Sequence, residues 1–191
     1  LTQDDLSWAY DRQTSDSFIA EAAQLLREGK IVAVKGLGGY HLACDAQNPS
    51  AIATLRQRKR REGKAFAVMV SSVEEAKQYC FVSEAEEYQL TQPSRPIVLL
   101  QKRPEVSFAC GLADALPELG IMLPSTPVQH LLLHEFKGML VMTSGNIHDE
   151  PIVTDEEHAF SQLGTVADAF LVNDRAIEGR YDDSVLRVLN A

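Results

Sequence analysis

Short apolar runs alternate with amphipathic stretches along most of this 191-residue chain. Turn-forming residues bound the runs, which is typical of strands covered on both faces of a sheet. We predict strands at residues 31–34, 40–46, 66–70, 96–100, 120–123, 139–143 and 169–172, with a last strand in the apolar stretch 184–189. Strands that alternate with helices at this spacing favour an α/β fold with an open sheet that can include an antiparallel portion.

Helix start and stop signals divide the amphipathic stretches. Thr14-Ser15-Asp16 is typical of a helix cap, and Gly29 is typical of a helix end. Asn48 and Pro49 predict another helix start, with asparagine as the cap and proline in the first turn. We predict helices from the first cap to Gly29 and at residues 49–60, 73–79, 84–91, 127–136 and 155–162.

The composition, with 45% hydrophobic and 24% charged residues, is that of an ordinary globular protein. The length favours a single domain covering residues 1–191. No apolar run approaches the roughly 20 residues of a membrane helix, and no signal peptide is evident, so we expect a cytoplasmic protein. The chain opens on Leu1 and closes just after an apolar stretch, which indicates a piece cut from a larger multidomain protein.

Residues 56–64 read RQRKRREGK and form a basic run. The run holds six of the 18 Lys and Arg and one of the 27 Asp and Glu, which leaves 12 cationic and 26 anionic residues elsewhere and a net charge of −14 there. An acidic body repels long polyanions, because duplex binding depends on neutralising many phosphates at once. The run therefore favours a small anion. Cations in a last helical turn also offset the helix dipole, which accounts for one or two of the six charges.

Two cations of this run are candidate ligand-binding residues. The apolar stripe of Ile52 and Leu55 continues to position 59, so Lys59 should lie on the inward-facing side of the last helical turn. Arg61 falls just beyond the helix, where the side-chain direction is less restricted. Arginine as a planar fork and lysine as a point charge both suit phosphate or carboxylate groups.

A second candidate site is the sequence VMTSGN at residues 141–146. Ligands of open α/β sheets bind beyond the carboxyl ends of strands, which is where Thr143 and the residues after it lie. Gly145 would let a backbone N–H approach an anion closely, while Ser144 and Asn146 supply uncharged donors. An ordinary Ser-Gly-Asn turn is the alternative.

Two weaker signals concern a phosphate loop and a metal. The glycines of residues 36–39 do not form a dinucleotide fingerprint, because that pattern requires glycine where this chain has His41. Asp183, next to Asp182 and Ser184, is a candidate Mg²⁺ ligand through its carboxylate, with a solvated turn as the alternative.

Taken in order, several stretches resemble the YrdC-like family along nearly the whole chain. They are Ile31 to Lys35, Tyr40 to Ala46, Lys59-x-Arg61 followed by Lys64, Leu123-Pro124 with Pro127, and Thr143 to Asn146. Within this family, GGYHLACDA at residues 38–46, RKRRE at 58–62 and DDS at 182–184 resemble the YrdC-like domain of the hydrogenase-maturation carbamoyltransferases HypF.

The resemblance implies a twisted open mixed sheet with helices packed around it and a concave basic ligand face. It also implies an enzyme that joins carbamate to ATP, with Mg²⁺, to give carbamoyl-adenylate and pyrophosphate. In such carbamoyltransferases an acylphosphatase-like domain makes the carbamate from carbamoyl phosphate. A Kae1-like domain then passes the carbamoyl group to the C-terminal cysteine of HypE, on the route to the cyanide ligands of nickel–iron hydrogenase.

Site residues are implied by the same resemblance. Lys59 and Arg61 match the family's Lys-x-Arg phosphate clamp, and Ser144 and Asn146 match its Ser-x-Asn pair, so these four are the candidate catalytic residues. The further candidates for binding nucleotide or substrate are Lys35, Tyr40, Lys64, Arg95, Thr143 and Arg180.

The chain departs from the family's threonylcarbamoyl-adenylate synthases at residues 35–38. Those enzymes have Pro-Thr-Glu/Asp-Thr where this chain has Lys35-Gly36-Leu37-Gly38, so the hydroxyls that would bind threonine are absent. We therefore expect the pocket to accept bare carbamate, with Lys35 helping to hold its charge. A threonylcarbamoyl-adenylate synthase and a double-stranded RNA-binding module remain alternatives, although the basic run lacks the aromatic residues on which bases stack.

Overall fold

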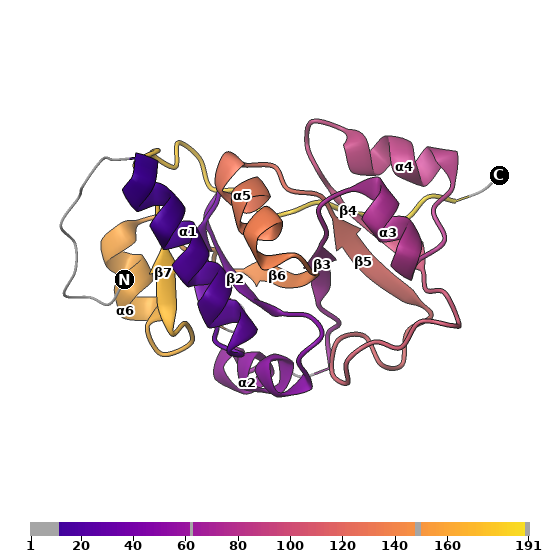
Figure 1. Cartoon of the computed structure of the whole chain (residues 1–191), viewed down its shortest axis with the longest axis horizontal. Coiled ribbons are helices and arrows are strands. Elements are labelled where there is room, and N and C mark those ends of the chain that lie inside the picture. Colours follow the sequence, from indigo (N-terminus) through magenta and orange to yellow (C-terminus); the bar gives the residue numbers. More distant parts are fainter. Residues whose placement is uncertain (1–11, 62, 148–149, 190–191) are drawn as a thin grey trace.

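The computed structural model describes residues 12–61, 63–147 and 150–189 (Figure 1). Its helices lie close to the predicted positions. They are α1 (Arg12–Arg27), α2 (Pro49–Lys59), α3 (Val73–Tyr79), α4 (Glu84–Thr91), α5 (Pro127–Phe136) and α6 (Glu156–Leu163). No helix among these residues is long and apolar enough to cross a lipid bilayer.

The predicted cap of the first helix was wrong. α1 begins at Arg12, so Thr14 and Ser15 lie inside the helix rather than before it. Serine and threonine are only modestly unfavourable inside a helix, so the apolar face of α1 outweighs the local capping signal. The predicted end was confirmed, because Gly29 adopts a left-handed φ of 79° and its N–H donates to the carbonyl of Leu26.

The described strands form one mixed eight-stranded sheet in the order β7-β1-β2-β6-β3-β5-β4-β8. Neighbours are parallel in β1–β7, β3–β5 and β4–β8 and antiparallel in the other pairs. The strands are β1 (Val32–Lys35), β2 (Tyr40–Asp45), β3 (Ala67–Met69), β4 (Ile97–Gln101), β5 (Glu118–Met122), β6 (Leu140–Ser144), β7 (Ala169–Leu171) and β8 (Val185–Leu186). This confirms the α/β class and the antiparallel portion, although β8 is much shorter than the apolar stretch predicted.

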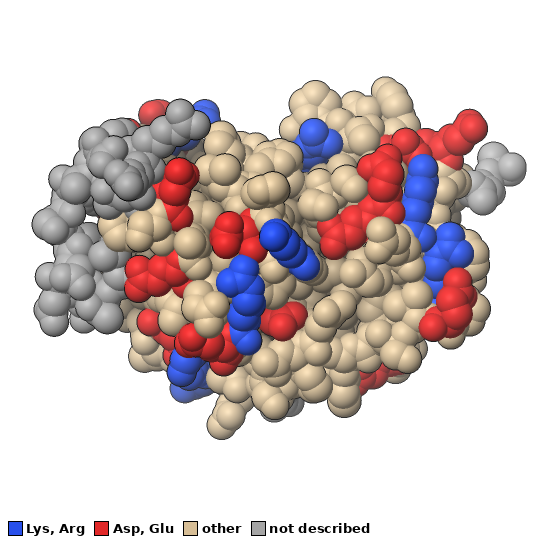
Figure 2. Space-filling view, viewed as in Figure 1, with Lys and Arg blue, Asp and Glu red and all other residues tan. Residues whose placement is uncertain are grey.

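Helices cover both faces of the sheet. α1 and α5 pack together in front of β2 and β6, and Leu26 and Leu133 belong to the core on that side (Figure 1). The second core lies on the other side and takes Leu55 from α2 and Leu163 from α6. On the α1–α5 face, acidic side chains lie among scattered Lys and Arg (Figure 2).

α2 is held at both ends by local hydrogen bonds. At its start, the side chain of Asn48 accepts from the N–H groups of Ser50 and Ala51, as the Asn-Pro signal predicted. At its end, Arg60 adopts a left-handed φ of 53°, and the N–H of Arg61 donates to the carbonyl of Arg56. The helix therefore stops immediately after Lys59, and the chain turns at the basic run.

Candidate functional site

Lys59 joins the two segments that the sequence singled out. Its side chain is buried, with 3% of the residue exposed, and its ammonium group donates to the carbonyls of Ser144 at 2.7 Å and Asn146 at 2.8 Å. It also donates to the Oδ1 atom of Asn146. The inward direction predicted from the apolar stripe of α2 is confirmed. All of these acceptors are uncharged, so they leave the positive charge of Lys59 in place.

The Ser144–Asn146 loop is tied together by its own polar groups. The hydroxyl of Ser144 donates to Asn146 Oδ1 at 3.1 Å, and Asn146 Nδ2 donates to the carbonyl of Glu150 at 2.6 Å. The N–H of Gly145 donates to the carbonyl of Tyr40 at 2.6 Å, and a Cβ atom at Gly145 would lie 2.5 Å from that oxygen. The loop is therefore held by several hydrogen bonds and packs closely against β2.

Arg61 lies just after α2 with part of its guanidinium unsatisfied. Its Nη2 atom donates to the carbonyl of Ala65 at 2.9 Å, and the group stacks 5.2 Å from the centre of the Phe66 ring. Its buried Nε atom has no hydrogen-bond partner among the described residues. A hollow of about 960 Å³ opens here, lined by Arg61 and by residues of α2 and the 111–116 segment. An unsatisfied arginine donor next to a hollow of this size suits an anionic ligand.

The other cations of the basic run either hold parts of the fold together or are exposed to solvent. Arg56 donates through Nε and Nη2 to the carbonyl of Gly111 and stacks 4.5 Å from the centre of the Phe66 ring. Arg58 donates to the carboxylate of Asp168 and to a backbone carbonyl. Arg60 and Lys64 are exposed. Lys59, which contacts the loop, and Arg61, which lines the hollow, have no carboxylate partner in the described hydrogen-bond and ion-pair network.

Burial and like charge make the Lys59 and Arg61 cations costly in the folded protein. Burial lowers the pKa of Lys59 from 10.5 to about 8, with a further contribution from the charge of Arg61, while Asp182 opposes the change. Burial and then the charge of Arg56 lower the pKa of Arg61, and Asp182 again opposes the change. An anionic ligand between these groups would relieve the cost.

Lys35 and Tyr40 form a separate cluster where β1 meets β2. They are cross-strand partners, and the ammonium of Lys35 donates to Glu156 at 2.5 Å and to the carbonyl of Asn173 at 3.0 Å. The charge of Lys35 is therefore already balanced by a carboxylate. The buried hydroxyl of Tyr40 has no partner among the described residues, and burial with the nearby Glu156 and Asp155 carboxylates raises its pKa.

The remaining sequence candidates lie in different places. Thr143 is buried on β6 directly before the loop. Arg95 adopts a left-handed φ of 45° and donates to the carbonyl of Leu90 at 3.3 Å, so it satisfies the end of α4. Arg180 is exposed and lines a hollow of about 420 Å³ with residues 150–155. Asp183 contacts His41, with 2.9 Å between Oδ2 and Nε2.

Two partners were not predicted from the sequence. Glu156 pairs with Lys35 from 121 positions away, and Asp182 acts on Lys59 and Arg61 from the C-terminal segment. No periodic pattern marks either contact. The pair of adjacent aspartates, 182 and 183, was the available signal, but it indicated a metal. Among the described residues, no group of three or more His, Cys, Asp or Glu is arranged to hold a metal ion.

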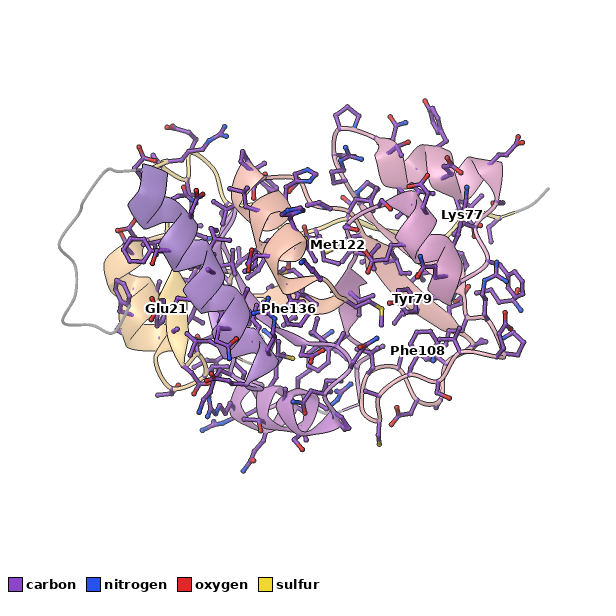
Figure 3. The ribbon with its side chains drawn as sticks, in the orientation of Figure 1. Glu21, Lys77, Tyr79, Phe108, Met122 and Phe136 are labelled. Atoms are coloured by element: carbon purple, nitrogen blue, oxygen red, sulfur yellow. The ribbon has the colours of Figure 1, made fainter. Side chains whose placement is uncertain are left out.

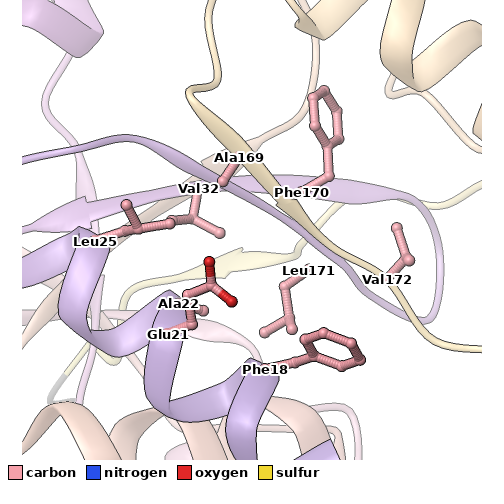
Figure 4. A pocket seen from close by; sticks show the side chains of 9 residues that line it. All are labelled: Phe18, Glu21, Ala22, Leu25, Val32, Ala169, Phe170, Leu171 and Val172. Atoms are coloured by element: carbon pink, nitrogen blue, oxygen red, sulfur yellow. The ribbon is translucent and has the colours of Figure 1, made fainter. Parts of the chain in front are cut away.

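Two apolar features elsewhere are core packing. Tyr79 and Phe108 lie near each other beside α3, with ring centroids 6.4 Å apart (Figure 3). A cavity of about 40 Å³ lies between α1 and β7, where Glu21 borders apolar residues such as Phe18 and Leu171 (Figure 4). It has room for about one water molecule, and none of the predicted site residues lines it.

Known proteins resemble this chain in sequence and in fold. The chain is 50% identical over 185 residues to the carbamoyltransferase HypF2 of Cupriavidus necator, a match that covers 88% of this chain and 23% of that protein. It superimposes with a TM-score of 0.86 and 53% identity on a crystal structure of full-length HypF in the phosphate- and nucleotide-bound form, covering 88% of this chain and 27% of that one. The chain thus spans about a quarter of the length of these carbamoyltransferases.

A more distant relative has a related activity. The chain is 30% identical over 153 residues to the human threonylcarbamoyl-AMP synthase, a match that covers 78% of this chain and 54% of that protein. The family model Sua5_yciO_yrdC, described as "Telomere recombination", matches residues 24–191. With the mixed sheet and the convergence of Lys59 on the Ser144–Asn146 loop, this match shows that the chain belongs to the Sua5/YciO/YrdC family.

Proposed function

We propose that this chain activates carbamate with ATP, giving carbamoyl-adenylate and pyrophosphate. The observation that carries the proposal is the convergence of Lys59 on the loop that ends β6, with Arg61 close enough for its charge to lower the pKa of Lys59 and with no partner for the Arg61 Nε atom among the described residues. The relatives support it, because they include carbamoyltransferases, a nucleotide-bound structure and a synthase whose named product is an acyl-adenylate.

In the proposed reaction, a carbamate oxygen attacks the α-phosphorus of ATP. The bond between that phosphorus and the bridging oxygen to the β-phosphorus breaks, and pyrophosphate leaves with the electron pair. Charge is conserved and no proton is transferred. Fixed cations near the leaving group stabilise the charge that it gains, without any reorganisation during the step.

Arg61 and Lys59 have different roles in the proposed site. Arg61 lines the hollow, so we propose that its guanidinium, whose buried Nε atom has no partner among the described residues, turns toward a phosphate when nucleotide binds. Lys59 already donates to the loop, so it contributes its charge and holds Ser144 and Asn146 in place. Lys35 has its charge balanced by Glu156, so we propose for it an orienting role toward carbamate rather than that of a free cation.

Mg²⁺ fits this site only as a partner of the phosphates. Asp183 is engaged by His41, and the described residues offer no metal cluster. Mg²⁺ is commonly held by one or two carboxylates together with substrate phosphates, and Asp182, in the field of Lys59 and Arg61, is the carboxylate available for this. When bound, the ion would neutralise phosphate charge.

We further propose that the chain works as one domain of a longer polypeptide. Its carbamoyltransferase relatives are about four times as long, so an acylphosphatase-like domain would supply the carbamate and a Kae1-like domain would consume the carbamoyl-adenylate. The final acceptor would be the C-terminal cysteine of HypE.

The test is pyrophosphate release by the purified chain with ATP and Mg²⁺ in ammonium carbamate solution. We expect release that requires carbamate and that falls at least a hundredfold in Arg61→Gln, because this change removes the phosphate-binding fork. Arg27→Gln, on an exposed cation of α1 that does not line the hollow, is the matched control and should behave like the unchanged protein. Pyrophosphate release that does not depend on carbamate would contradict the proposal.

Two further additions test the alternatives. Efficient threonylcarbamoyl-AMP formation with threonine and bicarbonate would favour the synthase activity of the human relative. Tight binding of duplex RNA with a steep salt dependence would favour an RNA-binding module. We expect neither result, because the threonine-binding hydroxyls are replaced at residues 35–38 and the chain has a net charge of −9.

A further inference from the structure

The segment between β7 and β8, residues 172–184, links the two outermost strands of the sheet, and we call it the strap. The strap passes β1 and β2 before it reaches β4, because Tyr181 contacts Gly38, Asp183 contacts His41 and Val185 pairs with Ile97. Figure 1 shows the yellow C-terminal segment passing behind α5 toward the C-terminus.

Two contacts hold the C-terminal part of the strap to β2 and to the turn before it. The N–H of Tyr181 donates to the carbonyl of Gly38 at 3.3 Å, and the Tyr181 ring packs against that glycine. The next contact is the one between Asp183 and His41, at 2.9 Å. Most strap residues are exposed, whereas His41 on β2 is only 7% exposed. The buried His41 is therefore the fixed partner in its contact with Asp183.

His41 lies directly beside the candidate site. It is the cross-strand partner of Ser144 in the β2–β6 register, so the two side chains share one face of the sheet. Asp182, between Tyr181 and Asp183, is thereby brought near Lys59 and Arg61.

We infer that His41 is a positioning residue of this site: by holding Asp183, it fixes the strap across the sheet so that Asp182 faces Lys59 and Arg61. This inference rests on the proposed function. The negative charge of Asp182 supports the inference, because it raises the pKa of Lys59 and of Arg61, whereas burial lowers both. The charge of Asp182 raises the pKa of Lys59, whereas the charge of Arg61 lowers it.

A strap that is already fixed need not be ordered when nucleotide binds. If it is loosened, ordering it consumes part of the binding free energy, so the KM for ATP rises while kcat at saturating ATP is retained. Damage to the fold would have the opposite pattern, because it lowers the active fraction and hence the apparent kcat.

The experiment compares His41→Leu with His41→Gln. Glutamine can place an N–H near the position of the imidazole Nε2 atom, whereas leucine fills similar space without a donor. In His41→Leu we expect the KM for ATP to rise about threefold to tenfold, the loss of one hydrogen bond, with kcat within twofold. We also expect the pH midpoint of nucleotide binding to move below that of the unchanged protein. His41→Gln should restore both values.

A second measurement reports on the strap without any enzyme activity. Trypsin should cleave after the exposed Arg175 and Arg180 several times faster in His41→Leu than in the unchanged protein or in His41→Gln. His130→Leu, the same change at an exposed position on α5, is the matched control. If His41→Leu does not fold, Asp183→Ala breaks the same contact from the strap side and should give the same results.

The outcomes separate the inference from the proposed function. Unchanged cleavage and unchanged KM in a folded His41→Leu protein, or a lower kcat at unchanged KM, would overturn the positioning role. An unchanged protein that releases no pyrophosphate with carbamate would overturn the proposed function, while the cleavage rates would still show whether His41 holds the strap.

Discussion

Nucleotide binding should weaken as the pH rises through the titration of Lys59. Its pKa is lowered from 10.5 to about 8, so charging it costs about 3 kcal/mol more in the folded protein than in the unfolded chain. This cost is present at neutral pH and disappears between pH 8 and 10.5, so Lys59 makes the ligand-free protein more stable as the pH rises across that window.

A bound triphosphate favours the protonated form of Lys59 and reverses this preference. With a pKa of about 8, Lys59 is about 90% protonated at pH 7 and about 10% at pH 9, so the affinity should fall roughly tenfold between these values. The terminal phosphate has a pKa of about 6, so it contributes little above pH 7.5.

The assay is calorimetric titration with a non-hydrolysable ATP analogue at several pH values. Buffers of different ionisation enthalpy should show that about half a proton is taken up per bound nucleotide at pH 8. Lys59→Arg is the control, because arginine stays charged throughout and its affinity should not depend on pH in this range. A flat profile for the unchanged protein, or the same slope in Lys59→Arg, would refute the reasoning.

Three further predictions concern the scaffold of the site, each measured as the free energy of unfolding in urea. Asn48→Ala should destabilise by about 0.5–2 kcal/mol through loss of the α2 cap, and a similar loss in the exposed Gln47→Ala would contradict this. Arg56→Ala should cost about 1.5–3 kcal/mol because its guanidinium holds a backbone carbonyl, whereas Arg60→Ala should stay within about 0.5 kcal/mol; equal losses would be inconsistent with the division of the basic run. Gly145→Ala should cost about 1–3 kcal/mol through crowding against β2, and a neutral effect would show that the loop has more room than described.

Local signals were sufficient for most of the fold. The helices at 73–79, 84–91 and 127–136 match the prediction because Ser72, Ser83 and Thr126 cap their starts. The observed strand ends differ from the predicted ones by one or two residues, because pairing with neighbouring strands determines where a strand ends. β8 was overpredicted because its apolar residues Val185 and Leu186 are exposed at a sheet edge, where hydrophobicity does not indicate length.

The site was only partly predictable. Helical periodicity located Lys59, because burial of a helix face is a local property. Arg56 contacts Gly111, which lies 55 positions away along the chain, and Arg58 contacts Asp168, which lies 110 positions away. The pairing of Lys35 with Glu156 likewise requires the β1–β7 crossover and the placement of α6. Charge counting therefore identified the basic run as a whole but could not separate its structural cations from those at the site.

The pairing of β8 with β4 has a consequence for the far side of the sheet. Val185 and Leu186, which are both exposed, pair with Ile97 and Val98, and the flanking residues Ser184 and Arg187 add contacts to Ile97 and Glu118. A slip of two residues, which would keep the same side chains outward, would shift the chain by roughly 7 Å along the strand. That distance exceeds the reach of a hydrogen bond, so Asp183 would leave His41. The alignment of one short edge strand thus helps to determine whether Asp183 stays in contact with His41 on β2.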